Sequence, residues 1–157
     1  MDKAMIEDRT GFSYDDFQAM APSALAALTA LGKAVDASGL EKPLTELVKL
    51  RVSQINRCAF CIQFHLGLAR RLGIAAAKLD LVAAWRDAGV HTARERAALD
   101  WAERVTRHAG EAEAEAALHD QFSPGEIFHL TLAIAHINAW NRIAGALRFP
   151  PVLTPPG

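Results

Sequence analysis

Two cysteines, a histidine and a glutamate lie in one short stretch of this 157-residue chain. Cys58 and Cys61 are the only cysteines, three positions apart, and His65 follows the second by four. With about 3.6 residues per helical turn, all three side chains share one narrow stripe of a predicted helix. The rest of that stripe is apolar. We therefore expect the thiols and the imidazole to be largely buried or at the foot of a narrow pocket.

These residue types can support a dithiol redox cycle. Cys58 falls at or near the helix start, where free N–H groups and the positive end of the helix dipole favour a thiolate. Cys61 and His65 are an i,i+4 pair, close enough for the imidazole to take the thiol proton. Cys58 and Cys61 can close a disulfide with little backbone movement.

The preceding helix supplies a carboxylate. Glu46, Leu50 and Ser53 share one face of it, and the connection to the cysteine helix is short. The two helices should pack side by side as a hairpin, which would let Glu46 meet His65. A carboxylate bound to one ring nitrogen fixes the tautomer and leaves the other nitrogen as a base. The pattern predicts a Glu, His, Cys relay.

The elements that must position these residues are helical throughout, because alanine and leucine dominate and no run alternates apolar and polar residues. We expect one all-α domain over residues 1–157. Ser123, Pro124 and Glu126 form a capping-box pattern at the start of the last helix. The predicted helices cover 22–38, 43–56, 58–72, 75–89, 92–110, a short segment ending near Phe122, and 123–147, followed by an extended tail at 148–157.

The charge balance excludes several classes of function. Lys and Arg total 17 and Asp and Glu total 18, so a nucleic-acid groove or a patch for acidic membranes is not expected. No apolar run indicates a secretory signal or a membrane span. We expect a cytoplasmic protein, in which thiols stay reduced and a close cysteine pair is catalytic or metal-binding rather than structural.

A weak internal similarity joins two parts of the chain. A shift of 80 positions places Glu46 on Glu126, and both cysteines on Asn138 and Asn141. Helical apolar spacing alone can produce such matches. The similarity is therefore consistent either with a duplicated helix pair in which one copy kept the thiols or with coincidence.

Six residues of this region carry a family resemblance. They resemble, in type and spacing, the motif of the AhpD-like alkylhydroperoxidases, within the carboxymuconolactone decarboxylase superfamily. The six residues are Glu46, Ser53, Asn56, Cys58, Cys61 and His65. The late segment AHINAWNR and the all-helical pattern are also similar to that family. The resemblance thus covers most of the chain and implies an AhpD-like helical bundle.

The resemblance implies roles for the motif residues. Cys61 would attack a hydroperoxide, and Cys58 would resolve the sulfenic acid as a Cys58–Cys61 disulfide, with no other cofactor. His65 and Glu46 would relay the proton, with Ser53 and Asn56 in support. The family further implies reduction by a dithiol or a lipoylated protein, electron transfer to a peroxiredoxin, and a homo-oligomer, often a trimer or hexamer.

Two positions depart from the family pattern. Phe60 stands where members commonly carry Tyr or His before the second cysteine, and it offers no proton or hydrogen bond. Arg57 replaces a frequent glycine. These departures leave the cysteine cycle intact and bear on the substrate.

Other readings of the motif remain. The cysteines could be core packing, or with His65 they could be part of a zinc site that still lacks a fourth ligand. The disulfide could serve a non-enzymatic redox-sensing oligomer, or His65 and Glu46 could be acid and base of a decarboxylase-type lyase. His136, beside Asn138 and Trp140 in an apolar helix, is more typical of a core or interface residue than of a catalyst.

Overall fold

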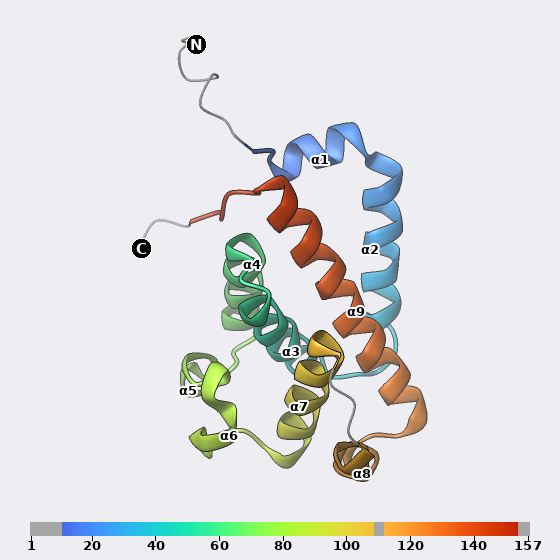
Figure 1. Ribbon diagram of the computed structural model, residues 1–157, viewed down its shortest axis with the longest axis vertical. Coiled ribbons are helices and arrows are strands. Elements are labelled where there is room, and N and C mark those ends of the chain that lie inside the picture. Colours follow the sequence, from blue (N-terminus) through green and yellow to red (C-terminus); the bar gives the residue numbers. More distant parts are fainter. Residues whose placement is uncertain (1–10, 109–111, 154–157) are drawn as a thin grey trace.

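The chain is all-helical in its computed structural model, which describes residues 11–108 and 112–153, with only the backbone of 112–114 (Figure 1). Its elements in chain order are α1 (Tyr14–Met20), α2 (Pro22–Asp36), α3 (Lys42–Ile55), α4 (Ala59–Arg71), α5 (Ala76–Asp80), the 3-10 turn η2 (Val82–Ala84), α6 (Trp85–Ala88), α7 (Ala93–Arg107), α8 (Ala112–Gln121) and α9 (Pro124–Leu147).

The long predicted helices are confirmed to within three residues at their ends. Their start signals also act as predicted. Ser123 caps α9 through the backbone N–H of Glu126, whose carboxylate returns a bond to the Ser123 N–H. Thr92 and Glu95 form the same capping box at the start of α7. Each box satisfies N–H groups that a helix start would otherwise leave unpaired.

Helix α1 was not predicted from the sequence. It begins with a capping box between Ser13 and Asp16, which is the signal that the lead-in sequence carries. Ala21 then ends α1 and precedes Pro22, the first residue of α2. Proline is favoured at a first helical position because it has no N–H to leave unpaired.

Residues 75–89 form three short pieces, and the single helix predicted there is wrong. Leu79, Val82 and Trp85 are the buried residues of this segment. They recur every three residues, a spacing that a 3-10 turn aligns and a 3.6-residue helix does not. The backbone accordingly tightens between α5 and α6.

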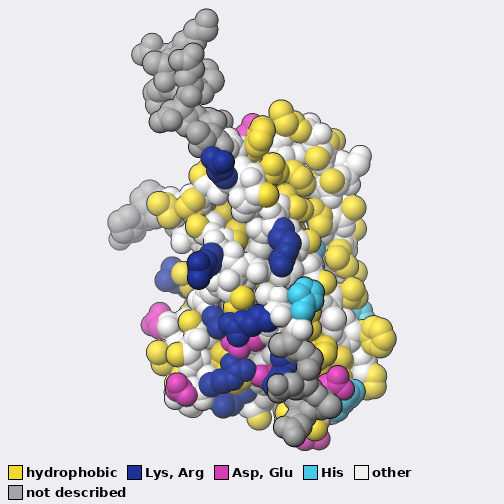
Figure 2. All heavy atoms as spheres, viewed as in Figure 1, with side chains coloured by type: hydrophobic (Ala, Val, Ile, Leu, Met, Phe, Trp, Pro, Cys, Tyr) yellow, Lys and Arg dark blue, Asp and Glu magenta, His cyan; other side chains and the backbone are white. Residues whose placement is uncertain are grey.

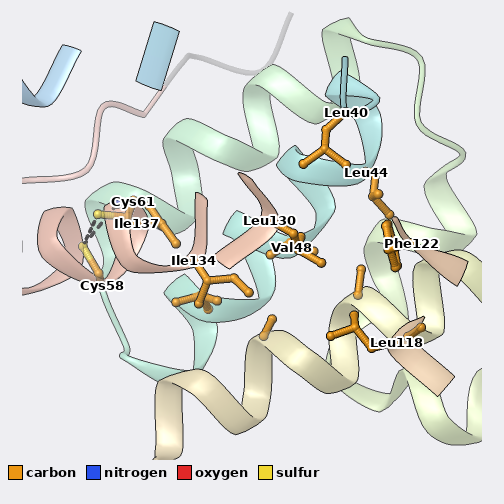
Figure 3. Packing of buried hydrophobic residues seen from close by; sticks show 14 of the residues in the cluster. Leu40, Leu44, Val48, Cys58, Cys61, Leu118, Phe122, Leu130, Ile134 and Ile137 are labelled. Atoms are coloured by element: carbon orange, nitrogen blue, oxygen red, sulfur yellow. Dashed lines mark hydrogen bonds between the residues drawn. The ribbon is translucent and has the colours of Figure 1, made fainter. Parts of the chain in front are cut away.

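Helix α3 lies at the centre of the bundle. Nine of its 14 residues are buried, and it packs against α4, α7 and α9. One hydrophobic cluster joins Leu44 and Val48 of α3 to Leu130, Ile134 and Ile137 of α9 (Figure 3). Both cysteines lie at one end of this same cluster. The core therefore holds α3, α4 and α9 together at the position of the thiols.

The internal similarity does not correspond to a duplicated helix pair. Arg57 ends the first segment in a left-handed conformation with φ 55°, so α3 and α4 are separate helices. The matching positions around Ile137 lie inside the unbroken helix α9. Shared apolar spacing accounts for the match.

The two ends of the described chain meet beside α9. The Phe12 N–H donates to the Leu147 carbonyl at 2.8 Å, and the buried Phe149 N–H donates to the Ala144 carbonyl. Residues 149–153 have neither helix nor strand, and the rest of the predicted tail, 154–157, lies outside the described residues. Across 11–108 and 112–153, no helix has the length and apolarity needed to cross a bilayer.

A second buried carboxylate ties α3, α6 and α7 together. Glu103 is 3% exposed and accepts hydrogen bonds from Arg51, Arg86, Arg107 and the Trp85 indole. Burial by itself raises the pKa of Glu103, but these donors outweigh it and lower the pKa. The guanidinium of Arg86 also lies 4.2 Å from the centre of the Trp85 ring.

Replacing Glu103 with glutamine should therefore destabilise the fold by about 3 kcal/mol, because the arginines lose their buried counter-charge. The free energy of unfolding in urea measures the loss. Asp100→Asn is the matched control, since Asp100 pairs with Arg86 and Arg104 nearer the surface. Its loss should stay below about 1 kcal/mol. Equal losses for the two variants would contradict the importance of burial.

Candidate active site

The turn between α3 and α4 places Cys58 at the start of α4. Arg57 occupies the left-handed region there, a conformation that costs a non-glycine residue about 1–2 kcal/mol. The Cys58 N–H donates to the Ser53 carbonyl at 3.1 Å, which closes the turn. Glycine would adopt the same conformation without that cost, which fits the glycine that the family resemblance implies at this position.

The two thiols are in contact. Cys58 is the N-cap of α4, and its sulfur accepts the Cys61 backbone N–H at 3.3 Å. The sulfur atoms are 2.6 Å apart, with one thiol donating to the other sulfur (Figure 3). Both cysteines are free and only 3% exposed. The pair is placed so that a disulfide needs little backbone movement.

The pair shares one proton tightly. The thiol hydrogen bond from Cys61 lowers the pKa of Cys58 to about 7 against the opposing effect of burial, with help from the Cys61 N–H and the Asn141 amide. Donating that bond, together with burial, raises the pKa of Cys61 far above its usual value. Near neutral pH the pair therefore loses one proton and keeps the other. That second proton can lie on either sulfur, because coupled groups titrate as a pair.

Glu46 and His65 are in contact, as the helix hairpin predicts. The ring Nδ1 lies 2.6 Å from Glu46 Oε2. Glu46 is completely buried and His65 is 9% exposed. With Nδ1 bound to the carboxylate, Nε2 is the nitrogen left for acid–base chemistry.

Two lysines that the sequence reasoning missed share the other carboxylate oxygen. The Nζ atoms of Lys42 and Lys49 each lie 3.1 Å from Glu46 Oε1. Burial alone raises the pKa of Glu46, but the His65 hydrogen bond and the nearby charges of Lys49 and Lys42 help to bring it to about 2. Glu46 is thus an anion at any physiological pH. The signal for the lysines was their spacing, four residues before and three after Glu46 on one helix.

A cavity of about 570 Å³ opens onto this site. Cys61, His65 and Glu46 line it, whereas Cys58 does not. Among the described residues, no hydrogen bond joins His65 to either sulfur. The imidazole and the Cys61 thiol instead face a shared space, in which a substrate or solvent molecule can bridge them.

The cavity walls are mainly apolar and aromatic. Tyr14 of α1 lies nearly parallel to Phe60, with ring centres 6.1 Å apart, and Phe60 stands in the same way to Phe64 at 6.5 Å. Trp140 and Leu68 complete this wall from α9 and α4. Phe60, which precedes Cys61 in the chain, thus adds an apolar surface rather than a proton donor.

Ser53 and Asn56 lie in a polar network rather than on the cavity wall. Asn56 donates from Nδ2 to Asn138 Oδ1 and Asn141 Oδ1, both at 2.9 Å. Asn141 Nδ2 donates to Ser53 Oγ at 3.0 Å. The network joins α3 to α9 beside the thiols. Asn138 and Asn141 were not predicted as site residues, and the sequence gives no sign that α9 lies against the turn.

His136 also lines the cavity, but its ring is engaged. The Trp140 indole N–H donates to His136 Nε2 at 3.1 Å, and burial lowers the pKa of this histidine. A methyl group on Gly32 of α2 would come within 3.0 Å of the ring Cε1 atom. His136 therefore acts as a packing residue between α9 and α2.

The zinc alternative finds no support in the arrangement. Within the part of the chain that the structure describes, no group of three or more His, Cys, Asp and Glu side chains could hold a metal ion. The carboxylate holds His65 by Nδ1 on one side of the ring, and the thiols bond to each other. The geometry fits acid–base and thiol chemistry.

Comparisons with known proteins match one family model and one curated relative. The model of the carboxymuconolactone decarboxylase family matches residues 22–104, which include every motif residue. The uncharacterized protein YdfG of Bacillus subtilis (strain 168) is 30% identical over 131 residues, 82% of this chain and 89% of YdfG.

Solved structures share the fold. A protein of unknown function from Agrobacterium tumefaciens, described as a candidate antioxidant defence protein AhpD, has a TM-score of 0.84 and 38% identity, over 88% of this chain and 97% of its own. An uncharacterized peroxidase-related protein from Ralstonia eutropha JMP134, with an alkylhydroperoxidase AhpD core, has a TM-score of 0.76 and 25% identity, over 86% and 74% of the two chains.

The shared proton predicts opposite effects of the two cysteine deletions on thiol ionisation. Wild-type protein should form one thiolate as the pH rises through about 7. In Cys61→Ala the donor to Cys58 is lost, so the pKa of Cys58 should rise. In Cys58→Ala the pKa of Cys61 should fall, because its thiol no longer donates to a thiolate. Ultraviolet absorbance of the thiolate against pH measures both, and an unchanged midpoint in Cys61→Ala would contradict the shared proton.

Proposed function

Because the chain belongs to the carboxymuconolactone decarboxylase family and its structural neighbours are AhpD-like alkylhydroperoxidase proteins, we propose that it is an enzyme that reduces organic hydroperoxides through Cys58 and Cys61. One observation carries this proposal. Cys61 and His65 line one cavity, and Glu46 holds the far side of the His65 ring.

The first step makes Cys61 the nucleophile. His65 Nε2 takes a proton from the cysteine pair through the cavity, and the remaining proton moves to Cys58, which leaves the thiolate on Cys61. This sulfur attacks the terminal oxygen of the hydroperoxide. An S–O bond forms as the O–O bond breaks, and the alkoxide leaves as an alcohol with the proton from His65. Cys61 becomes a sulfenic acid.

The second step closes the disulfide. Cys58 attacks the sulfenic sulfur, the S–O bond breaks, and the hydroxyl leaves as water with the thiol proton. The contact between the sulfurs supports this step, since Cys58 needs no rearrangement of α4 to reach Cys61. The position of Cys61 on the cavity wall and of Cys58 behind it supports this order of roles.

The third step restores the thiols. One thiolate of a dithiol attacks Cys61, the Cys58–Cys61 bond breaks, and Cys58 takes a proton as a thiol. The second thiolate of the dithiol then attacks its own partner sulfur in the mixed disulfide and releases Cys61, so that both cysteines are reduced and the dithiol becomes a disulfide. We propose a lipoylated protein as the physiological donor and a peroxiredoxin as a further electron acceptor. A reducing compartment such as the cytoplasm would maintain that supply.

The apolar surface supports a homo-oligomer, which we propose is a trimer or hexamer. Figure 2 shows hydrophobic side chains along the edge over α2 and the N-terminal part of α9. Met20 and Phe128 are 74% and 73% exposed, and Leu132 is 40% exposed. Apolar groups gathered in this way are typical of surfaces that pair with another protein.

The central test replaces the cysteines one at a time. Cys61→Ser should abolish turnover of cumene hydroperoxide with dihydrolipoamide, because the attacking thiolate is gone. Cys58→Ser should allow one oxidation and then stall with a trapped sulfenic acid or mixed disulfide, which mass spectrometry detects. Wild-type turnover by Cys61→Ser would refute the proposal.

The same variants separate the two rival functions. A redox-sensing oligomer would change its assembly on oxidation without any turnover, which sedimentation with and without hydroperoxide reveals. A decarboxylase-type lyase would need only His65 and Glu46 as acid and base. Its activity would survive in a Cys58→Ser, Cys61→Ser double variant.

The proton relay has its own test. His65→Asn and Glu46→Gln should each lower kcat/KM for hydroperoxide by about 10²–10⁴ fold, the usual range for loss of a positioned acid–base group. His119→Asn serves as the control, because His119 is exposed on α8 and does not line the cavity. Loss of activity in the control equal to that in His65→Asn would show a general effect of the substitution.

A further inference from the structure

The Glu46 carboxylate contacts two lysines in addition to His65, although the contact with His65 is enough to orient the imidazole ring. Oε2 faces His65, and Oε1 lies 3.1 Å from both Lys42 and Lys49. Lys49 is itself 5% exposed, a rare burial for a lysine. Within the described residues, its ammonium group bonds to the carboxylate of Glu46.

The lysines alter what this carboxylate does to the histidine. A fully buried carboxylate alone with an imidazole at 2.6 Å strongly favours the imidazolium ion, because the ion pair gains from the low dielectric around it. A histidine that already holds its proton cannot take one from a thiol. Two ammonium groups on the other oxygen reduce that pull, since they compete for the same negative charge and repel an imidazolium.

We propose that Lys49, with Lys42 in a smaller role, is a positioning residue that balances the charge of Glu46 so that His65 stays unprotonated and ready to act as the base. This inference rests on the proposed function of His65 as the proton acceptor. It adds a residue outside the glutamate, histidine and cysteine set.

The other charged groups around the ring do not replace the lysines. On α4, Cys61 lines the same cavity as His65. On α9, His136 lines the same cavity, and burial lowers its pKa, so it stays neutral. On α2, Asp36 faces Lys42 at 2.7 Å and weakens the charge of that lysine. Lys42 thus shares its charge between Asp36 and Glu46, whereas the described contacts of the Lys49 ammonium group are with Glu46.

The structure also fixes Lys49 firmly. Its backbone carbonyl accepts the Ser53 hydroxyl at 2.8 Å, and Ser53 in turn accepts the Asn141 amide. Lys49 lies one turn from Glu46 on the central helix α3. The backbone of Lys49 is thus fixed relative to Glu46, and the burial of its side chain keeps the ammonium group beside the carboxylate.

The test measures the histidine directly and needs no turnover. Proton and carbon NMR follows the His65 ring against pH, with the signal assigned from its absence in His65→Asn. Lys49→Met should move the midpoint of this titration up by roughly one pH unit, the size expected when a nearby like charge is removed. Lys49→Arg keeps the charge and should leave the midpoint close to that of the wild type.

Two further variants complete the comparison. Lys42→Met should move the midpoint in the same direction by less, because Lys42 is more exposed and shares its charge with Asp36. If Lys49→Met does not fold, this shift carries the test. Lys33→Met is the control, since Lys33 lines the cavity but, among the described contacts, makes no hydrogen bond or ion pair with Glu46. It should leave the midpoint unchanged.

Kinetics then separates this inference from the proposed function. In an active enzyme, the acid limb of the kcat/KM profile should move upward in Lys49→Met by the same amount as the NMR midpoint. If Lys49 only stabilises the fold, Lys49→Met should lower the free energy of unfolding and leave both midpoints in place. That result would overturn the inference. A wild-type protein without hydroperoxide turnover would refute the proposed function, while the NMR midpoints would still decide the role of Lys49.

Discussion

The organisation of the site depends on one buried charge. A carboxylate removed from water costs several kcal/mol unless partners replace its hydration. Glu46 has those partners from two helices, with lysines of α3 on one oxygen and the imidazole of α4 on the other. The relative position of the two helices that pairs this carboxylate also places Cys61 on the cavity wall. The requirement for a paired charge thus sets where the thiol lies.

A second constraint acts on the thiols from across the bundle. Asn141 of α9 bonds to Ser53 of α3 and to Asn56, the C-cap of that helix, beside the turn that presents Cys58. Its amide helps to lower the pKa of Cys58 and offsets part of the rise in the pKa of Cys61. Buried amides that are fully hydrogen-bonded hold a unique arrangement, because each lost bond leaves an unsatisfied group. The polar network and the hydrophobic cluster of α3 and α9 therefore support the same geometry.

Local periodicity predicts much of the site but not its long-range parts. The stripe of Cys58, Cys61 and His65 and the contact with Glu46 follow from helical spacing and a short turn. Lys49 was missed because a lysine within a helix normally indicates a solvent-facing position, and only the fold shows that it is buried. Asn141 is 80 positions beyond Cys61, so no local pattern connects them. The breaks in residues 75–89 follow from the burial of Val82 and Trp85 against α7 and α3, which the alanine-rich sequence conceals.

The arrangement of the two sulfurs relative to the cavity has a consequence for the order of events. Cys61 lies on the wall and Cys58 behind it, so anything that enters from solvent by this route meets the same sulfur first. An oxidant and a reductant that both use this cavity would have to bind one after the other. The two half-reactions would then be separated in time, and the disulfide between the two cysteines would hold the oxidising equivalents until the reductant binds.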